Sequence, residues 1–447
     1  MNDLFKLPSD HPLRRPLADE VHARPPAPVS VPAAISCLAL FDCDAGAVFD
    51  HVTQLALRYS EDPPEPGGHV IVELPEVRVK WERHGEFSSL TFVRPIRDLH
   101  AEAPTLASFS HFPTAFEVLP ADWLAALPGR IVAAADIALL PAGDEETVPR
   151  WEQVSRWFVR DAMAGSSVLD EAAMVFTDFV LPADSDRTRW LVLDRQGMSR
   201  AQAARVVQRI IEIEIYRMAA LLAFPLARAA FPELNRIEQR LAEITSATAA
   251  LHGRGEPKQT QDEERRLLDE LTRVASEVER SVAATSFRFS AGQAYWEIVQ
   301  ARVREFREQR VGDLRTLGGF LSRRLAPAMN SCAAAARRQE ELSARIERAS
   351  ALLRTRVDVA REEQNQQLLA AMERRGKVAL RLQQTVEGLS VAALTYYLVG
   401  LVGYGVKPLK QVFPNLNTDW VVAGSIPVLA FIVWRAVGRL RKQLMHD

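Results

Sequence analysis

The hydrophobic pattern of the chain changes twice along its length. Between residues 33 and 193, short apolar runs are separated by short helical segments, and residues 76–82 alternate apolar with charged side chains, as a half-buried strand does. From residue 199 to about residue 387, apolar residues recur every three or four positions, which is typical of long amphipathic helices. Two apolar runs without charged residues follow, at 389–406 and 421–434. The sequence therefore predicts an α+β protein with an N-terminal mixed sheet, a long helical stalk and a C-terminal apolar hairpin.

The first of these parts has the spacing of a small mixed sheet. We expect strands at residues 33–41, 70–74, 76–82, 86–93, 130–140, 172–180 and 188–193, and a helix at 47–59. His84 and Gly85 are expected to form a hairpin turn between two of the strands. Because the pattern becomes helical after Gly197, we place the sheet domain at residues 33–197 and the stalk at 198–387.

The first stalk helix has a clear beginning. Ser199 and Gln202 are spaced as a capping box, in which each side chain binds a backbone N–H at the helix start. Within this helix, Glu212, Glu214 and Arg217 are spaced for ion pairs, which we expect on a solvated face.

The remaining stalk is predicted as further helices. Glycine and proline interrupt the pattern at residues 251–258, where two helices turn back on each other, and Pro327 is expected to kink or split a later helix. From about residue 352 the helical pattern enters the first apolar run with only Gly376 and Gly388 as weak breakers. We therefore expect one continuous helix from the stalk into that run.

The two apolar runs predict a transmembrane hairpin at residues 388–438. A bilayer core of roughly 30 Å needs about 20 helical residues, which the first run nearly supplies and the second supplies with its flanks. Trp420 and Trp434 bracket the second run as interfacial aromatics do. Basic residues flank both outer ends, including a basic tail at 439–447, so we expect both termini and the bulk of the chain in the cytoplasm. The alternative is a helical pair buried in a soluble protein.

Composition narrows the function classes. The 447 residues are 48% hydrophobic and 25% charged, with a net charge of -2, and acids are interleaved with bases, which excludes a general nucleic-acid binder. Cys37, Cys43 and Cys332 form no CxxC pair, so we expect buried free thiols rather than disulfides or a zinc site. No secretory signal is expected at the N-terminus.

Motifs for catalysis are missing from the sequence. No phosphate-binding GxxxxGK[ST] loop, GxSxG elbow, HExxH helix or dinucleotide-binding GxGxxG occurs, so we predict neither an enzyme nor a cofactor. Asp42, Asp44 and Asp50 are candidates for a hard cation, but acids in loops are usually solvated, and we predict no metal site.

The N-terminal segment 1–32 is rich in proline and is expected to be an extended strap docked on a surface. It carries a basic group that includes His22 and Arg24, which we consider as a ligand or anion clamp. The alternative is a strap held by ion pairs to its own domain.

One face of the first apolar run combines polar and apolar side chains. This polar face consists of residues at three- and four-residue steps: Leu380, Gln383, Glu387, Ser390, Leu394, Tyr397, Leu401 and Tyr404. Such a face is unusual against lipid. It predicts either packing of copies around an axis with a narrow pore, or an interface with the second run, whose Gly424 and Ser425 permit close approach.

Several segments resemble one known family. They read HPLRRPLADEVHARPP, WERHGEF, EIEIYRMAALLAFP, LLRTRVDVAREEQNQQLLAAMERR and LQQTVEGLSVAALTYY. Together they resemble a family of bacterial membrane-anchored proteins known only as a domain of unknown function. The resemblance implies a bacterial inner-membrane location and no particular activity.

The architecture is also similar to that of the CorA magnesium channels, which are pentamers. In that family the first span lines the pore and ends in a Tyr-Gly-Met-Asn filter. Tyr404 and Gly405 match its first two positions, whereas Val406 and Lys407 replace the last two. A ring of lysines would repel divalent cations, so the resemblance does not extend to magnesium selectivity.

Two functional hypotheses follow. The first is a homo-oligomeric protein of CorA-like build in the lipid bilayer, transporting ions or small solutes under a regulatory cytoplasmic domain. Its pore or interface candidates are Glu387, Ser390, Tyr397, Tyr404, Gly405 and Lys407. The second is a membrane-tethered scaffold that binds a partner and transports nothing.

Overall fold

The computed structural model describes residues 11–15, 17–18, 26, 28–97, 108–142, 154–251, 257–407 and 418–444. Contacts divide the chain into two compact units. The first is Met1–Ala249 with Asp269–Ala349, and the second is Ala250–Leu268 with Ser350–Asp447. These units cut across the sheet and stalk domains that the sequence suggests, and the domain boundaries stay a prediction.

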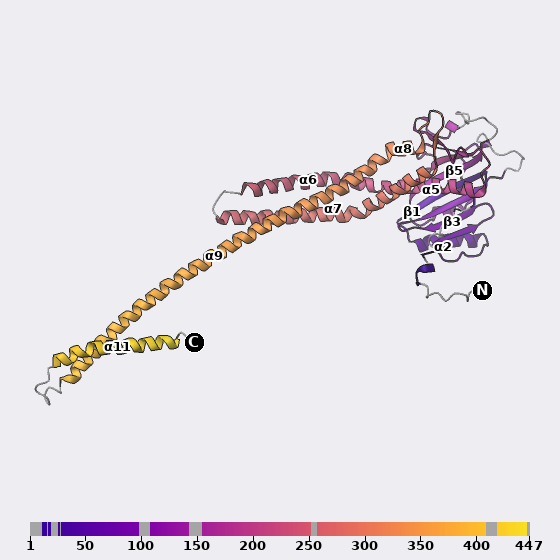
Figure 1. Cartoon of the computed structure of the whole chain (residues 1–447). Helices are drawn as coiled ribbons and strands as arrows, with labels where there is room; N and C mark the ends of the chain where they lie inside the picture. The colour runs from indigo at the N-terminus through magenta and orange to yellow at the C-terminus, as the bar shows by residue number, and fades with distance from the viewer. Residues whose placement is uncertain are drawn as a thin grey trace, which may run out of the picture. The chain divides into compact units, whose positions relative to one another are not determined.

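The first unit contains a mixed sheet of nine strands in the order β2-β3-β4-β1-β5-β8-β7-β6-β9 (Figure 1). The strands are β1 Ala33–Phe41, β2 His69–Glu73, β3 Arg78–Arg83, β4 Phe87–Pro95, β5 Arg130–Pro141, β6 Ala164–Val168, β7 Ala173–Thr177, β8 Thr188–Asp194 and β9 Gln309–Arg310. Only the β5–β8 pair is parallel among them. The predicted α+β class is therefore confirmed, with β1 predicted at its observed bounds.

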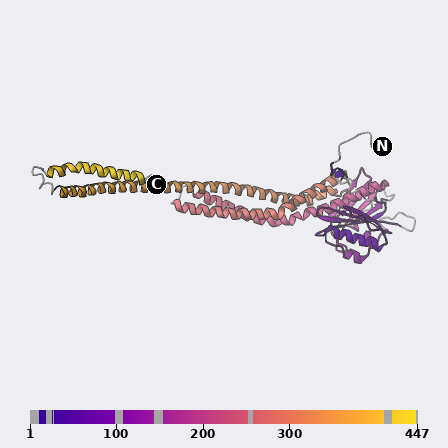
Figure 2. The same cartoon turned by 90° about the horizontal axis from the view of Figure 1, so that it is seen from below.

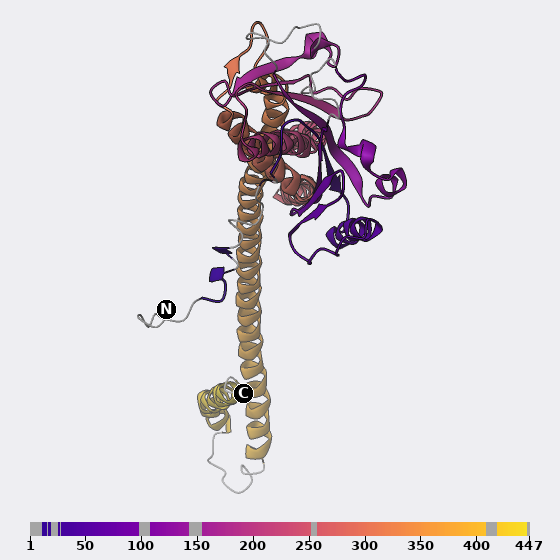
Figure 3. The same cartoon turned by 90° about the vertical axis from the view of Figure 1, so that its right-hand side faces the viewer.

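Helices cover both faces of the sheet. Alternate residues of β1 enter two different cores: Leu38 packs with helix α2 (Ala45–Arg58), and Cys37 packs with helix α5 (Arg200–Leu221). In Figure 3, α2 and α5 lie on opposite sides of the sheet. The predicted capping box at the start of α5 is present, with both Ser199 and Gln202 bonding backbone N–H groups.

Because helices cover both faces of the sheet, the expectation that β3 is half-buried is wrong. Its charged residues were expected on a solvated face, yet the side chains of Lys80 and Glu82 are only 2% and 6% exposed. Their Nζ and Oε1 atoms lie 2.9 Å apart, so each charge offsets the other in the core. Across the ladder, buried Ser89 and Thr91 are paired with them. The half-buried strand is therefore a buried one, because the sheet has no solvated face here.

The strands β6 and β9 are absent from the prediction. Small residues dominate β6, and β9 is only two residues long, so neither has a hydrophobic alternation to detect. β7 is shorter than the predicted strand 172–180. In the sheet, β9 pairs with β6 although it follows the long helices in sequence.

The helical part follows the predicted order with fewer breaks. After α5 come α6 Ala223–Ala250, α7 Pro257–Glu305, α8 Leu317–Arg324, α9 Ala326–Val406 and α11 Thr418–Leu444. α7 runs without a break over its 49 residues. The split at Pro327 is confirmed, since α8 ends and α9 begins just before it. The continuous helix into the first apolar run is also confirmed, since α9 spans it. Gly376 and Gly388 do not break this helix, because a helical glycine costs only about 1 kcal/mol.

Within the first unit, α6, α7 and α9 lie side by side (Figures 1 and 2). Arg240 of α6 forms an ion pair of 2.7 Å with Glu277 of α7. Between α7 and α9, buried Gln339 donates to the hydroxyl oxygens of Ser281 and Thr285 at 3.0 Å. Polar contacts of this kind fix the register of neighbouring helices, which apolar packing alone specifies less strictly.

Candidate functional site

The end of α9 and helix α11 are the two apolar helices that the sequence suggests. Both are long and apolar enough to cross a membrane, and only 6% of each apolar window is buried. A helical pair in the core of a soluble protein would be mostly covered. The two helices are therefore not buried within this chain, and their insertion in a membrane stays a prediction.

The two helices contact each other along a narrow line. On α9, Thr395 is buried, and on α11, Val433 is buried. Near the other end of the pair, a Cβ on Gly403 would meet Val422 Cγ2 at 3.7 Å, so this glycine is the one at the close approach. Gly424 is exposed with no atom within 4 Å of its Cβ position, and the expected close approach at Gly424 is wrong. Its neighbour Ser425 is half-buried.

The polar face lies elsewhere on α9. Leu394, Tyr397, Leu401 and Tyr404 are between 53% and 73% exposed, so α11 does not cover them. Ser390 is also exposed, and its hydroxyl donates to the carbonyl oxygen of Val386 at 2.8 Å. These side chains are not buried against α11, and both explanations of the face, as an interface with the second run and as a pore or oligomer surface, stay hypotheses.

The remaining pore candidates lie at the two ends of this face. Glu387 is half-buried, and its Oε1 atom accepts a hydrogen bond from Gln383 at 3.3 Å. At the other end Gly405 is exposed, and the Lys407 ammonium lies 5.1 Å from the centre of the Tyr404 ring. Tyr404 and Lys407 also line a hollow of about 500 Å³ with Asp419 of α11.

A second exposed stripe on α9 went unnoticed in the sequence. This apolar seam is between 58% and 71% exposed and consists of Leu368, Met372, Leu382, Val386 and Leu389. Leu368 and Met372 form one group and Leu382, Val386 and Leu389 another, each with four- or three-residue steps, the spacing by which helices pack side by side; the two groups lie ten residues apart on the same broad face. The spacing of these apolar residues is visible in the sequence, but the uninterrupted apolar run that begins at Leu389 is the stronger hydrophobic pattern.

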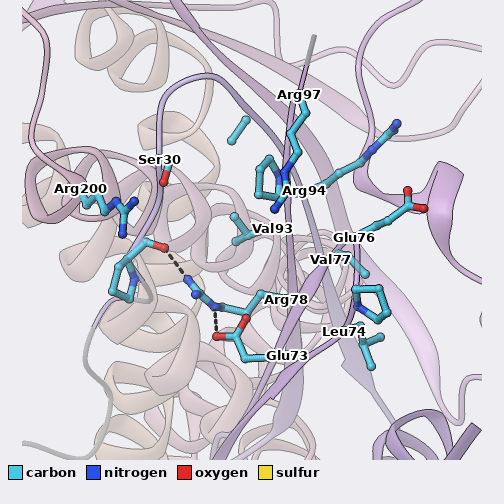
Figure 4. A pocket seen from close by; sticks show the side chains of 14 residues that line it. Ser30, Glu73, Leu74, Glu76, Val77, Arg78, Val93, Arg94, Arg97 and Arg200 are labelled. Carbon is cyan, nitrogen blue, oxygen red and sulfur yellow. Dashed lines mark hydrogen bonds and ion pairs between the residues drawn. The ribbon is translucent and has the colours of Figure 1, made fainter. Parts of the chain in front are cut away.

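The sheet carries the second candidate site, an arginine-lined pocket of about 520 Å³ (Figure 4). Its floor is formed where β1 begins and β4 ends, by Ala33 and the buried side chain of Val93. The pocket is lined by residues 28, 30 and 33, by 73–78, by 93–95 and 97, and by residue 200. Hereafter this is the arginine pocket, named for Arg78, Arg94, Arg97 and Arg200.

Two of these arginines are held by acids. Arg78 donates from Nε to Glu73 and from Nη1 to the Pro28 carbonyl, both at 2.5 Å. Arg94 donates to Glu117 at 2.5 Å and turns away from the pocket (Figure 4). Burial raises the pKa of Glu117, but hydrogen bonds from Arg94 and His111 outweigh it and hold this pKa below its usual value. The carboxylate therefore stays charged and keeps Arg94 engaged.

The other two arginines have no such partner. Within the described part of the chain, the Arg97 and Arg200 side chains make no ion pair or hydrogen bond. Figure 4 shows Arg78, Arg97 and Arg200 around Val93, with Arg97 and Arg200 approaching from different elements. Arg97 follows β4, and Arg200 is the first residue of α5.

The N-terminal strap reaches this pocket. The backbone N–H of Val29 donates to the Arg200 carbonyl at 3.5 Å, and Val29 is buried. Ile96 donates its backbone N–H to the Pro32 carbonyl at 3.1 Å. These residues at the end of the strap are docked. The expectation of an extended, docked strap is wrong for the described residues near its start, because residues 14, 15, 17 and 18 are helical and residues 11–15, 17 and 18 are exposed. The proposed clamp at His22 and Arg24 lies outside the described residues.

The loop acids and the cysteines have structural surroundings. Asp44 caps α2 by accepting from the backbone N–H of Ala47 at 3.0 Å, and Asp42 lies 3.9 Å from Arg130. No group of three or more metal-ligating side chains is found in the described ranges. All three cysteines are free; Cys37 and Cys332 are buried, as expected.

Comparisons with known proteins give one match. Residues 9–444 match the family described as "Protein of unknown function (DUF3422)". No curated protein and no solved structure matches the chain, so the resemblance to CorA channels has no support from them. The family match confirms the predicted resemblance to an uncharacterised family. Because it spans nearly the whole chain, the protein belongs to the DUF3422 family.

Proposed function

We propose that the protein is a homo-oligomer anchored in the bacterial inner membrane, in which the first spans surround a narrow polar path for small solutes or ions. The observation that carries this proposal is the exposure of the polar face of α9. Tyr397 and Tyr404 are more than 70% exposed, although they belong to a helix apolar enough to cross a membrane.

Three faces of α9 support assembly from several copies. One face carries the buried Thr395 and Gly403, which lies beside Val422 of α11. The polar face is rotated around the helix by one residue, or about 100°, from this first face. The continuation of the apolar seam is rotated by one further residue. Polar groups within a bilayer face a bundle interior or a water-filled cavity. The apolar seam would pack against a neighbouring copy, and the polar face would then turn toward the shared axis.

The charge at the end of the path restricts what passes. Lys407 stands at the end of the polar face that we place on the outer side of the membrane. Several copies would form a ring of ammonium groups, which repels cations and attracts anions. Small anions or neutral solutes therefore fit this path better than magnesium does.

The proposal is tested by flux in liposomes that contain the purified full-length protein. Lys407→Asn should raise cation flux relative to anion flux, and Glu387→Ala should lower cation flux, because each removes a charge from one end of the path. Lys377→Asn is the matched control, since Lys377 lies on α9 before the apolar run and pairs with Glu373 at 2.7 Å.

The absence of flux from a folded oligomer would contradict transport. The spans would then be an anchor, and the protein a membrane-tethered scaffold for a partner. In that case an unrelated two-span anchor in place of residues 388–438 should preserve partner binding, whereas a transporter would lose its activity with the same exchange.

A further inference from the structure

We propose that the arginine pocket binds a small molecule that carries phosphate groups, with Arg97 and Arg200 as its principal ligands. This proposal does not depend on the transport function. It rests on the charge, shape and construction of a pocket that lies entirely within the first unit.

The pocket concentrates positive charge that its own acids do not neutralise. Glu73 is engaged by Arg78, and Arg94 is engaged by Glu117 outside the pocket. The remaining acid in the lining, Glu76, lies on the side toward which Arg94 turns (Figure 4). The centre of the pocket therefore faces guanidinium groups with no carboxylate between them.

The two unpaired arginines are placed to act together. They come from separate elements, and their carrier segments are tied by backbone bonds, from Ile96 to Pro32 and from Val29 to Arg200. Arg200 also opens α5, whose positive N-terminal end adds to the local potential. Guanidinium groups present planar forks of N–H donors, which match the oxygen spacing of phosphate better than an ammonium does.

Arg78 completes this arrangement from a fixed position. Its two hydrogen bonds, to Glu73 and to the Pro28 carbonyl, restrict its side chain before any ligand arrives. A restrained donor loses less conformational entropy on binding than a free one. Arg78 therefore orients one side of the pocket, while Arg97 and Arg200 supply the uncompensated charge.

Size and lining indicate a ligand larger than a single phosphate. The volume of about 520 Å³ falls in the range of small-molecule sites, roughly 300–1,000 Å³. Apolar surface is provided mainly by the exposed Pro75 and Pro95, over the buried Leu74 and Val77, beside the charged side of the pocket. A phosphate ester with a compact apolar or planar body satisfies both parts of this lining.

The test is calorimetric titration of the full-length protein in neutral-lipid nanodiscs with inorganic pyrophosphate and with a nucleoside diphosphate. Binding is expected for both, and the nucleoside diphosphate should bind more tightly because its body covers the apolar wall. Arg97→Ala and Arg200→Ala should each weaken binding about tenfold, the value of one charge-assisted contact. Both side chains are exposed, so the variants should fold, which circular dichroism checks.

Controls separate a built site from general attraction to positive charge. Arg130→Ala removes the same charge from an 84% exposed side chain outside the pocket and should leave the affinity unchanged. Arg97→Lys keeps the charge but removes the fork, and should still weaken binding. Equal losses in Arg97→Ala and Arg130→Ala, or no binding of either probe by the wild type, would overturn the proposal.

A lipid headgroup is the other source of the same phosphate chemistry. Nanodiscs that contain phosphatidylglycerol distinguish it, at matched ionic strength. If the headgroup occupies the pocket, pyrophosphate should bind more weakly in these nanodiscs than in neutral ones. Its affinity should return to the higher value in neutral detergent without lipid. Unchanged binding would identify a soluble phosphate compound.

Discussion

At the scale of single residues, Glu214 and Arg217 form an ion pair inside the first core. Their side chains are 1% and 10% exposed, with Nη2 and Oε1 at 2.5 Å, and Trp190 donates its Nε1–H to Glu214 at 3.3 Å. The expected pair is thus present, but its solvated position was wrong. Glu212 forms its ion pair with Arg302 of α7, and not with a residue of its own helix.

Removal of one partner should therefore be costly. We expect Arg217→Ala to lower the free energy of unfolding by about 3–5 kcal/mol, because it leaves a carboxylate buried without its counter-charge. Arg209→Ala, which breaks the more exposed pair with Glu305, should cost at most about 1 kcal/mol. Chemical unfolding of the full-length protein in detergent measures both. Equal small losses would show that Glu214 is well solvated without its partner.

At the scale of elements, Glu238 ties α6 to α9. It accepts hydrogen bonds from Arg338 and, at 3.0 Å, from Arg345. The bond from Arg338 is the main reason that the pKa of Glu238 lies below its usual value. A carboxylate with a lowered pKa stabilises the folded state at neutral pH, and this contribution is lost as the pH falls below the usual 4.5.

Glu238→Gln should therefore lower the unfolding temperature at pH 7 and have little effect in acid. The loss at pH 7 should stay below about 1 kcal/mol, because the pair is partly exposed to water. Unfolding temperatures of both proteins across the acidic range test this. A difference that is constant with pH would mean that packing, rather than charge, is what the substitution removes.

At the scale of the whole molecule, the apolar seam of α9 needs a partner. Large apolar side chains exposed in a regular row mark an interaction surface more often than scattered ones do. The proposed oligomer would bury the seam between neighbouring copies, beside the polar face of the same helix.

Polar substitutions in the apolar seam should then dissociate the oligomer. Leu382→Gln with Val386→Gln should weaken association by on the order of a hundredfold, because each buried side chain contributes roughly 1.5–3 kcal/mol. Val359→Gln, at a 54% exposed position on the opposite face of α9, is the control. Light scattering of the detergent-solubilised protein reads out the mass. A monomeric wild type would contradict the oligomer itself.

Part of the candidate site could be predicted and part could not. The polar face of α9 follows from helical periodicity, which places residues such as Ser390 and Tyr397 on one side. Periodicity does not say which neighbour covers that side, and the close approach to α11 that the structure shows is at Gly403, beside Val422. The arginine pocket joins residues between 28 and 200, which no local pattern relates.

The sequence by itself determined the α+β class, strand β1, the capping box of α5, the split before Pro327 and the uninterrupted helix α9. These features depend on neighbours in the chain, such as an alternating strand or a cap beside its helix, so they can be detected locally. Tertiary structure alone decided that Lys80 and Glu82 are buried, that β9 joins the sheet, and that Arg97 and Arg200 line one pocket. Each of these depends on which distant element covers or adjoins a surface, and local patterning carries no information about that.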